Sequence, residues 1–348
     1  MFDLIRFSSD YTEGAAPEIL AALADINLNQ YSGYGTDAIC EEARKLIRFE
    51  VEREDVDVHF LMGGTQCNMT LIASALRPHE GVISVDTGHI AVHETGAIES
   101  TGHKVLTVPA TDGKMQLSDL AEIYSLHSDE HMVKPRLIYL SQTTEMGTIY
   151  TRNELNDIKA FAQDHDLLIY IDGARLGSAL TAPGSDCSMA HLAQIADAFS
   201  IGGTKNGMLF GEALVIANNV LKPDFRYFIK QKGGLLAKGW LLGLQFQVMF
   251  RDGLYYRLAE HANKQCEKIR KTLKHLDVPL MSSSHSNQLF PIFSWEFITE
   301  LSETIGFELI EKVGNDKAAI RFVTSWATND VDVEILCSCL RKYRSLGF

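Results

Sequence analysis

The sequence lacks the features that mark membrane-embedded or secreted chains. No apolar run approaches the roughly 18 residues that a membrane span requires, and residues 1–6 carry charges where a signal peptide would be apolar. The six cysteines form no C-x-x-C pair and show no disulfide-like spacing. We therefore expect a cytoplasmic protein whose thiols are free and buried.

Basic residues are too few to bind nucleic acid or anionic lipid by electrostatic attraction. Lys and Arg number 32 against 45 Asp and Glu, a formal net charge of −13, and no dense basic run stands out. Neither nucleic acid nor a membrane is therefore expected as a partner. A small anionic ligand would need a local positive pocket.

What the chain does contain is the composition and rhythm of an α/β enzyme. Its 348 residues exceed the size at which one core usually stops growing, so two domains are expected. Short, continuously apolar runs alternate with helical patterns, as in strands buried on both faces of a parallel sheet. The strands are expected at 56–61, 82–85, 105–108, 137–140, 168–171, 198–201 and 213–216, and the helices at 65–76, 89–100, 118–127, 152–165 and 188–194.

Late in the chain the pattern changes. Residues 252–276 have the apolar spacing of one long amphipathic helix, and strand-like segments follow at 288–294 and 319–325. We expect a large domain over 1–245 and a smaller α+β domain over 246–348.

Three polar segments follow predicted strands, at the sheet edge where open α/β folds bind ligands. The first is Met62-Gly-Gly-Thr-Gln-Cys-Asn68. Gly63 and Gly64 let the backbone approach a ligand, and a helix starting at Thr65 offers free N–H groups, which suit a phosphate. The same residues also fit a plain turn with a threonine cap. No Lys-Ser or Lys-Thr pair follows, so a nucleotide loop is excluded.

The second and third segments supply a carboxylate and an amine. In Ile171-Asp-Gly-Ala-Arg175, Asp172 ends a buried strand and needs a cation, either Arg175 or a protonated ring nitrogen of a cofactor. In Ser200-Ile-Gly-Gly-Thr-Lys205-Asn-Gly207, a glycine-flanked loop presents Lys205. A helix start for phosphate, a carboxylate for a ring nitrogen and a lysine for an aldehyde match the polar groups of pyridoxal phosphate. We predict that this cofactor is held as a Schiff base on Lys205.

Two further residues suit this site. His89 begins a predicted helix, where its imidazole could stack on a flat cofactor ring. With His93, four residues later, it could instead bind zinc, but no third ligand is obvious, so no metal is expected. Arg321 lies in a predicted strand and suits capture of a substrate carboxylate, although a surface ion pair is the commoner fate of one arginine.

Taken together, these segments resemble the low-specificity threonine aldolases of the β-eliminating lyase family. The matching segments are Phe7-Ser-Ser-Asp10, Tyr34-Gly35, Met62-Gly-Gly-Thr65, Gly88-His-Ile90, His93-Glu-Thr-Gly-Ala97, Ile171-Asp-Gly-Ala-Arg-Leu176 and Thr204-Lys-Asn-Gly207. The resemblance implies the fold-type-I architecture of pyridoxal-phosphate enzymes, with an aspartate-aminotransferase-like large domain and mostly parallel sheet. It also implies retro-aldol cleavage of a β-hydroxy-α-amino acid of the threonine or allo-threonine type to glycine and an aldehyde.

The resemblance assigns roles to single residues. Lys205, Asp172 and His89 would be catalytic, and His89 would also stack on the ring. The remaining cofactor contacts would come from Gly63, Gly64, Thr65, Arg175 and Lys232, and the substrate contacts from Ser9, Tyr34, Thr144, Arg175 and Arg321. The resemblance also implies a homodimer or homotetramer. One helix start and a threonine hydroxyl leave part of the phosphate charge uncompensated, so we expect Lys232, or else Lys230, to reach the phosphate of a neighbouring subunit.

The chain departs from the family at three places. Ser141-Gln-Thr-Thr144 replaces a Glu-Asn-Thr-His segment, so Thr144 stands where the family has a histidine thought to contact the substrate hydroxyl. His89, through water or Thr144, is then the expected base, or it only stacks. Thr204-Lys-Asn206 and Lys232-Gly-Gly-Leu-Leu236 also differ from the family pattern.

Two alternatives stay open at this point. One is another pyridoxal lyase on the same scaffold, such as a phenylserine-type aldolase or a lyase that eliminates a β-substituent. The other is a non-catalytic α/β module that binds a phosphorylated metabolite through Gly63-Gly-Thr65.

Overall fold

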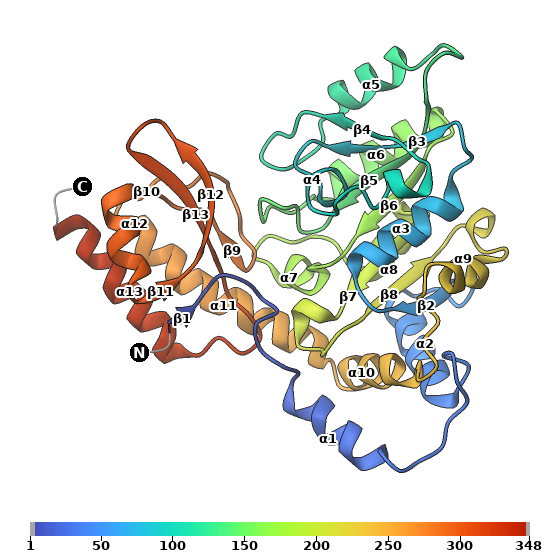
Figure 1. Cartoon of the computed structure of the whole chain (residues 1–348), viewed down its shortest axis with the longest axis horizontal. Coiled ribbons are helices and arrows are strands. Elements are labelled where there is room, and N and C mark those ends of the chain that lie inside the picture. The colour runs from blue at the N-terminus through green and yellow to red at the C-terminus, as the bar shows by residue number, and fades with distance from the viewer. Residues whose placement is uncertain (1–3, 346–348) are drawn as a thin grey trace.

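The computed structural model describes residues 4–345 and shows two lobes joined by one long helix (Figure 1). The larger lobe contains a seven-stranded sheet ordered β2-β8-β7-β6-β5-β3-β4. All seven strands expected from the sequence are present: β2 (Asp57–Leu61), β3 (Glu80–Val85), β4 (Val105–Val108), β5 (Lys134–Ser141), β6 (Leu168–Asp172), β7 (Ala198–Gly202) and β8 (Glu212–Ile216).

The sheet is mostly parallel, as predicted, with one strand reversed. β8 is antiparallel to both β7 and β2, whereas the pairs from β4 to β7 are parallel. The reversal follows from the short connection between β7 and β8, because a parallel return would need a crossover. The first residue of β8, Glu212, therefore pairs with Gly202 and Leu61 at the carboxyl ends of their strands.

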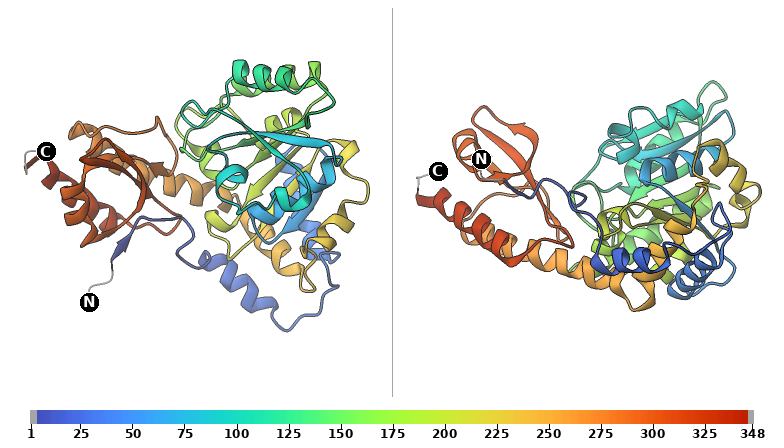
Figure 2. Two further views of the ribbon diagram at one scale, coloured as in Figure 1. Left: turned by 45° about the horizontal axis from the view of Figure 1, so that its top comes forward. Right: turned by 60° about the horizontal axis from the view of Figure 1, so that its bottom comes forward.

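Helices cover both faces of this sheet (Figures 1 and 2). They are α1 (Pro17–Ile26), α2 (Ala38–Glu50), α3 (Gly64–Ala75), α5 (Leu117–Leu126), α6 (Arg152–Asp164), α7 (Leu176–Thr181), α8 (Met189–Ile195), α9 (Phe225–Gln231) and α10 (Trp240–Arg251). None of the helices within residues 4–345 is long and apolar enough to cross a membrane.

The expectation of one continuous helix over residues 89–100 is wrong. The α-helix α4 (His89–Val92) ends after one turn, and a short 3-10 helix follows at Glu99–Thr101. Between them Thr95 and Gly96 have φ angles of 52° and 71°. This left-handed conformation interrupts a right-handed helix.

The sheet is buried on both faces, which explains its continuously apolar strands. In β6, Ile169 and Ile171 belong to a core cluster on one face, and Leu168 and Tyr170 to a cluster on the other. Alternate residues of a strand point to opposite faces, so both parities must be apolar when both faces are covered.

The smaller lobe is an α+β unit. Its long helix α11 (Leu254–His275) matches the helix expected at 252–276. The strand expected at 288–294 is divided at Pro291, which has no N–H to donate. The remaining elements are β1 (Ile5–Arg6), β9 (Gln288–Leu289), β10 (Ile292–Ser294), α12 (Trp295–Ser302), β11 (Ile305–Gly306), β12 (Glu308–Val313), β13 (Lys317–Val323) and α13 (Asp330–Ser345).

The hydrophobic cores of the two lobes meet along α11. Leu254 and Tyr255 at its start belong to the core of the large lobe, and Ile269 and Leu273 near its end to that of the small lobe. Position 245, where we expected a boundary, lies inside α10. We propose that the division falls within α11, and that the N-terminal strand β1, which pairs with β11, belongs to the small lobe.

Candidate active site

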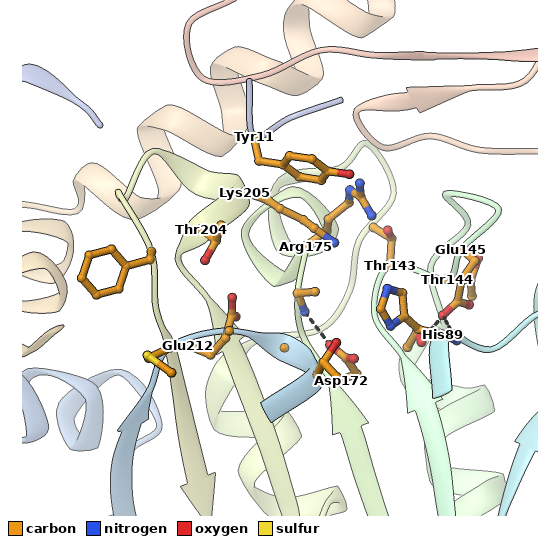
Figure 3. Close-up of a pocket in the computed structure, with 17 residues that line it drawn as sticks. Tyr11, His89, Thr143, Thr144, Glu145, Asp172, Arg175, Thr204, Lys205 and Glu212 are labelled. Atoms are coloured by element: carbon orange, nitrogen blue, oxygen red, sulfur yellow. Dashed lines mark hydrogen bonds between the residues drawn. The ribbon is translucent and has the colours of Figure 1, made fainter. Parts of the chain in front are cut away.

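A cavity of about 330 Å³ lies at the carboxyl ends of the central strands (Figure 3). The parallel register pairs Ser141 with Asp172, so the loops after β5 and β6 meet at one edge. The three polar segments singled out in the sequence therefore converge on one site. Of the predicted site residues, those that line the cavity are Gly63, Gly64, Thr65, His89, Thr144, Asp172, Arg175 and Lys205.

The start of α3 forms one wall of this cavity. Gly63 is the N-cap residue, and no side chain caps the helix. The expectation of a threonine cap is therefore wrong, since the helix begins before Thr65. A Cβ added at Gly63 or Gly64 would meet nothing within 4 Å. The glycines thus leave open space directly beside first-turn N–H groups that have no partner within the helix.

Asp172, the last residue of β6, receives three hydrogen bonds. Oδ2 accepts from Nδ2 of Asn68 at 3.0 Å and from the hydroxyl of Tyr139 at 2.7 Å, and Oδ1 accepts from the N–H of Ala174 at 2.9 Å. An ionised carboxylate only accepts, so this set of donors fits its charged form. Arg175 is not among the partners. The alternative that Arg175 is the cation paired with Asp172 is therefore wrong.

The same network extends to His89 through two buried side chains. Nδ2 of Asn68 also donates to Oε1 of Glu94 at 2.7 Å, and that oxygen lies 2.8 Å from Nδ1 of His89. Because a carboxylate is acceptor-only, Nδ1 of His89 carries the proton and Nε2 is left for the cavity. Sequence reasoning missed both Asn68 and Glu94, although they lie within the segments it quoted.

The zinc alternative for His89 and His93 would need a third ligand. Their ring centroids lie 5.6 Å apart, and Nδ1 of His89 is occupied by Glu94. Among residues 4–345 no group of three or more His, Cys, Asp or Glu side chains is placed to hold a metal ion.

Lys205 follows β7 in a single 3-10 turn, Thr204–Asn206. Its side chain extends over the end of β6 toward Arg175 (Figure 3). Burial and, next, the positive charge of Arg175 lower the pKa of the Lys205 amine. A larger fraction of unprotonated amine favours attack on an aldehyde carbon.

Glu212 is a cavity residue that the sequence did not predict. It lines the cavity together with Lys205 and Asp172. Burial and the charge of Asp172 raise the pKa of Glu212 to about 8, so its carboxyl is mostly protonated at neutral pH. Its Oε2 is buried and has no hydrogen-bond partner among the residues described. Open α/β folds place ligand residues after strands, whereas Glu212 begins β8, so the sequence pattern gave no signal for it.

Arg175 is held by an aspartate from the N-terminal segment. Its Nε and Nη2 donate to Oδ2 and Oδ1 of Asp10 at 2.7 and 3.0 Å, and Asn287 donates to Oδ2 at 2.9 Å. Burial alone would raise the pKa of Asp10, but the positive charges of Arg175 and Lys205 outweigh it and lower that pKa. The bidentate pair fixes the guanidinium at the cavity wall.

A second cavity, of about 500 Å³, adjoins the first and reaches Arg321 in β13. Arg321 forms an ion pair with Glu308, and its Nη1 lies 3.4 Å from Oε1 of Gln288. Burial and, next, Arg175 lower the pKa of Arg321. Five residues line both cavities, which therefore lie side by side: Tyr11, His89, Glu145, Arg175 and Lys205.

Three predicted residues line neither cavity. Ser9 is buried, and its Oγ has no partner among the residues described. Tyr34 is 48% exposed, and its ring faces the Lys230 ammonium at 5.0 Å. Lys232 approaches α3 through its backbone, because its carbonyl accepts from Nε2 of Gln66 at 3.1 Å.

Thr144 lines the cavity, but its hydroxyl is engaged elsewhere. Oγ1 of Thr144 lies 2.7 Å from Oγ1 of Thr148, whose hydroxyl donates in turn to the carbonyl of Asp112. The same Thr144 oxygen accepts from the N–H of Thr148 at 3.2 Å. These bonds within the loop leave Thr144 poorly placed to relay a proton to His89.

The architecture is that of fold-type-I pyridoxal-phosphate enzymes. Thermus thermophilus aspartate aminotransferase, 13% identical, superposes with a TM-score of 0.73 over 98% of this chain and 92% of its own, a likeness of fold alone. The family model of the β-eliminating lyases matches residues 6–295. The chain belongs to the β-eliminating lyase family.

Two relatives resemble the chain over nearly its full length. The low specificity L-threonine aldolase of Pseudomonas aeruginosa is 33% identical, over 97% of both chains. A solved structure of Leishmania major threonine aldolase is 45% identical, with a TM-score of 0.96 over 97% of this chain and 98% of its own.

The chain is accordingly a lyase that uses pyridoxal phosphate. The described residues fit that group on three counts. Gly63 and Gly64 leave the open space beside a helix start that a phosphate requires, Lys205 presents an amine of lowered pKa, and Asp172 ends β6, the strand next to β7.

Proposed function

We propose that this lyase cleaves β-hydroxy-α-amino acids of the threonine and allo-threonine type to glycine and an aldehyde. The observation that carries the proposal is the pair of adjoining cavities, one lined by Lys205 and Asp172 and the other by Lys205 and Arg321. Relatives named threonine aldolases, 33% and 45% identical over nearly the whole chain, support the same reaction.

In this proposal, residues of the cavity that contains Asp172 bind the cofactor. Lys205 binds the cofactor's aldehyde carbon, Asp172 holds its ring nitrogen, and Gly63, Gly64 and Thr65 hold its phosphate. When bound, pyridoxal phosphate supplies an electron sink for the pair that bond cleavage leaves on Cα. Glu212, kept neutral, adds no charge close to the anionic phosphate.

Arg321 and Arg175 are the groups we assign to the substrate carboxylate. The positive charge of Arg175 contributes to lowering the pKa of Arg321, and a carboxylate bound between the two guanidinium groups would relieve that repulsion. Arg321 has Nε buried without a partner among the described residues, so one guanidinium edge is still unsatisfied. Ser9, which lines neither cavity, is not expected to touch the substrate directly.

His89 is assigned to the face of the cofactor ring. Its bond to Glu94 fixes the plane of the imidazole and its tautomer. Asn68 links that pair to Asp172, so the groups proposed to touch the ring nitrogen and the ring face are held by one network.

Product analysis tests the reaction directly. Purified protein with bound cofactor is incubated with the isomers of threonine and phenylserine, and the products are separated. We expect glycine and an aldehyde. Pyruvate and ammonia would identify an eliminating lyase instead, glycine only from phenylserine would shift the substrate class, and a colourless protein that forms no product would support the non-catalytic module.

We further propose that the enzyme is a homodimer or homotetramer in which each site is completed by a neighbour. Tyr34 lies against α9, where Arg226 donates to its carbonyl at 3.1 Å and Lys230 faces its ring. With Lys232 these side chains form a basic edge that does not enter the cavity of its own chain. A doubly charged phosphate at α3 needs such a cation, so Lys232 is assigned to the neighbour's site, and Tyr34 likewise.

Subunit mixing tests the shared site. Lys205→Ala should be inactive, and Lys232→Glu is expected to hold cofactor poorly in every site of its own oligomer. Co-refolding the two should restore partial activity, because a mixed dimer contains one site with both native residues. Lys264→Glu, on the exposed face of α11, is the matched charge reversal and should retain cofactor. No recovery in proven heterodimers, or a fully active monomer by sedimentation, would reject the shared site.

A reducing, cytoplasmic location is also proposed. All six cysteines are free in the structure, and most are buried. Burial raises the pKa of the Cys266 thiol to about 12, which keeps it protonated and unreactive.

A further inference from the structure

Glu145 is a partly buried carboxyl that borders both cavities and has no task in the assignments above. Its Oε1 accepts from the backbone N–H of His89 at 2.8 Å and from the hydroxyl of Ser141 at 2.7 Å. Both of these bonds are to Oε1, and no side-chain hydrogen bond from another residue to Oε2 is found within residues 4–345. One oxygen is therefore anchored, and the other is left for a ligand.

We propose that Glu145 is the general base that removes the β-hydroxyl proton of the substrate. The inference rests on the proposed aldol cleavage and names the residue that initiates it. The position fits the task, because Glu145 lines both the cavity with Asp172 and the adjoining cavity with Arg321. A substrate that reaches from the cofactor to Arg321 would therefore lie beside Glu145.

The electrostatics of Glu145 suit a base. Burial raises its pKa, only partly offset by the hydrogen bonds from Ser141 and His89. A carboxylate with a raised pKa binds a proton more readily than a solvated one, which improves proton transfer near neutral pH.

Other groups at the cavity are less well placed for this step. The hydroxyl of Thr144 is occupied by Thr148, and both oxygens of Asp10 are bound to Arg175. Glu212 lies across the cavity from Glu145 (Figure 3) and does not border the space around Arg321. His89 retains a free Nε2, so the experiment must separate it from Glu145.

Proton removal by Glu145 is coupled to cleavage of the Cα–Cβ bond. Oε2 of Glu145 takes the hydroxyl proton, and the O–H electron pair becomes the second bond of the aldehyde carbonyl. The Cα–Cβ bond breaks, and its electron pair remains with Cα. A proton that comes ultimately from solvent is added to Cα and completes glycine, and the proton on Glu145 returns to solvent.

Glu145→Gln tests the proposal, because glutamine still accepts from Ser141 and His89 but cannot act as a base. Threonine cleavage should fall by about 10²–10⁴-fold, the usual contribution of a general base. Exchange of the α-hydrogen of glycine in D₂O should stay close to that of the unmodified enzyme, since it requires Lys205 and the cofactor but no hydroxyl proton. The glycine-induced change in the visible spectrum should also remain.

The outcomes separate the possible failures. Cleavage by Glu145→Gln close to that of the unmodified enzyme overturns the assignment and leaves His89 as the base. Loss of exchange and cleavage together also overturns it, because Glu145 would then only support the site. If the unmodified enzyme releases no glycine from any threonine isomer, the proposed function itself fails.

A pH profile provides a second readout. Glu145 acts when deprotonated, so kcat/KM should fall as pH falls through its pKa. Removing the Ser141 hydroxyl takes away a bond that lowers that pKa. In Ser141→Ala the acid limb should therefore move to higher pH, whereas Ser74→Ala on α3 should leave it in place. An acid limb that is the same in both variants contradicts the role of Glu145.

Discussion

Lys205→Ala should lose essentially all turnover, by at least about a thousandfold on the scale of positioned catalytic groups. The structure supplies the reason, because burial and Arg175 lower the pKa of this amine and no other lysine lines the cavity within residues 4–345. Borohydride reduction of the unmodified enzyme should fix the cofactor covalently on the peptide that contains Lys205.

The matched control for this prediction is Lys264→Ala, an exposed lysine of α11. In this variant borohydride should still fix the cofactor on the Lys205 peptide, and turnover should match that of the unmodified enzyme. Covalent trapping on another lysine, or a Lys205→Ala variant that keeps the colour of a lysine-bound cofactor, would show that the amine has been assigned wrongly.

Asp172→Asn should reduce turnover by about tenfold to a hundredfold while the cofactor stays bound. The loss of a charged hydrogen-bond partner costs roughly 1.5–3 kcal/mol. The substitution should weaken electron withdrawal by the cofactor ring, and it should leave the contacts to the phosphate and the aldehyde carbon in place. The structure adds a second cost. Asn68, Tyr139 and Ala174 all donate to the carboxylate, and an amide NH₂ would face at least one of these donors.

The measurement is kcat and the cofactor content of the variant after dialysis. Asp37→Asn is the matched control, because Asp37 is a buried aspartate that caps α2, and asparagine caps equally well. Unchanged kcat in Asp172→Asn, or loss of cofactor in proportion to loss of activity, would refute the proposed contact with the ring nitrogen.

Local patterns in the sequence were sufficient to locate the sheet and three walls of the site. A strand buried on both faces must be apolar at successive positions, so all seven strands could be recognised. Because parallel strands share their carboxyl edge, segments after β2, β6 and β7 could be expected to converge. The helix expected at 89–100 failed for an equally local reason, since the left-handed backbone of Thr95 has no clear signature in composition.

Long-range contacts decided the rest. Asp10 meets Arg175, 165 positions away, and Asn68 meets Asp172, 104 positions away, through side-chain bonds that no spacing rule reveals. Glu212 and Glu145 are acidic residues like many others in the sequence. The reversed direction of β8 carries the first into the cavity, and two hydrogen bonds aim the second at it. Residue types and local order thus defined the cofactor chemistry, whereas strand direction and register determined which acids surround it, because only the folded chain brings distant residues within bonding distance.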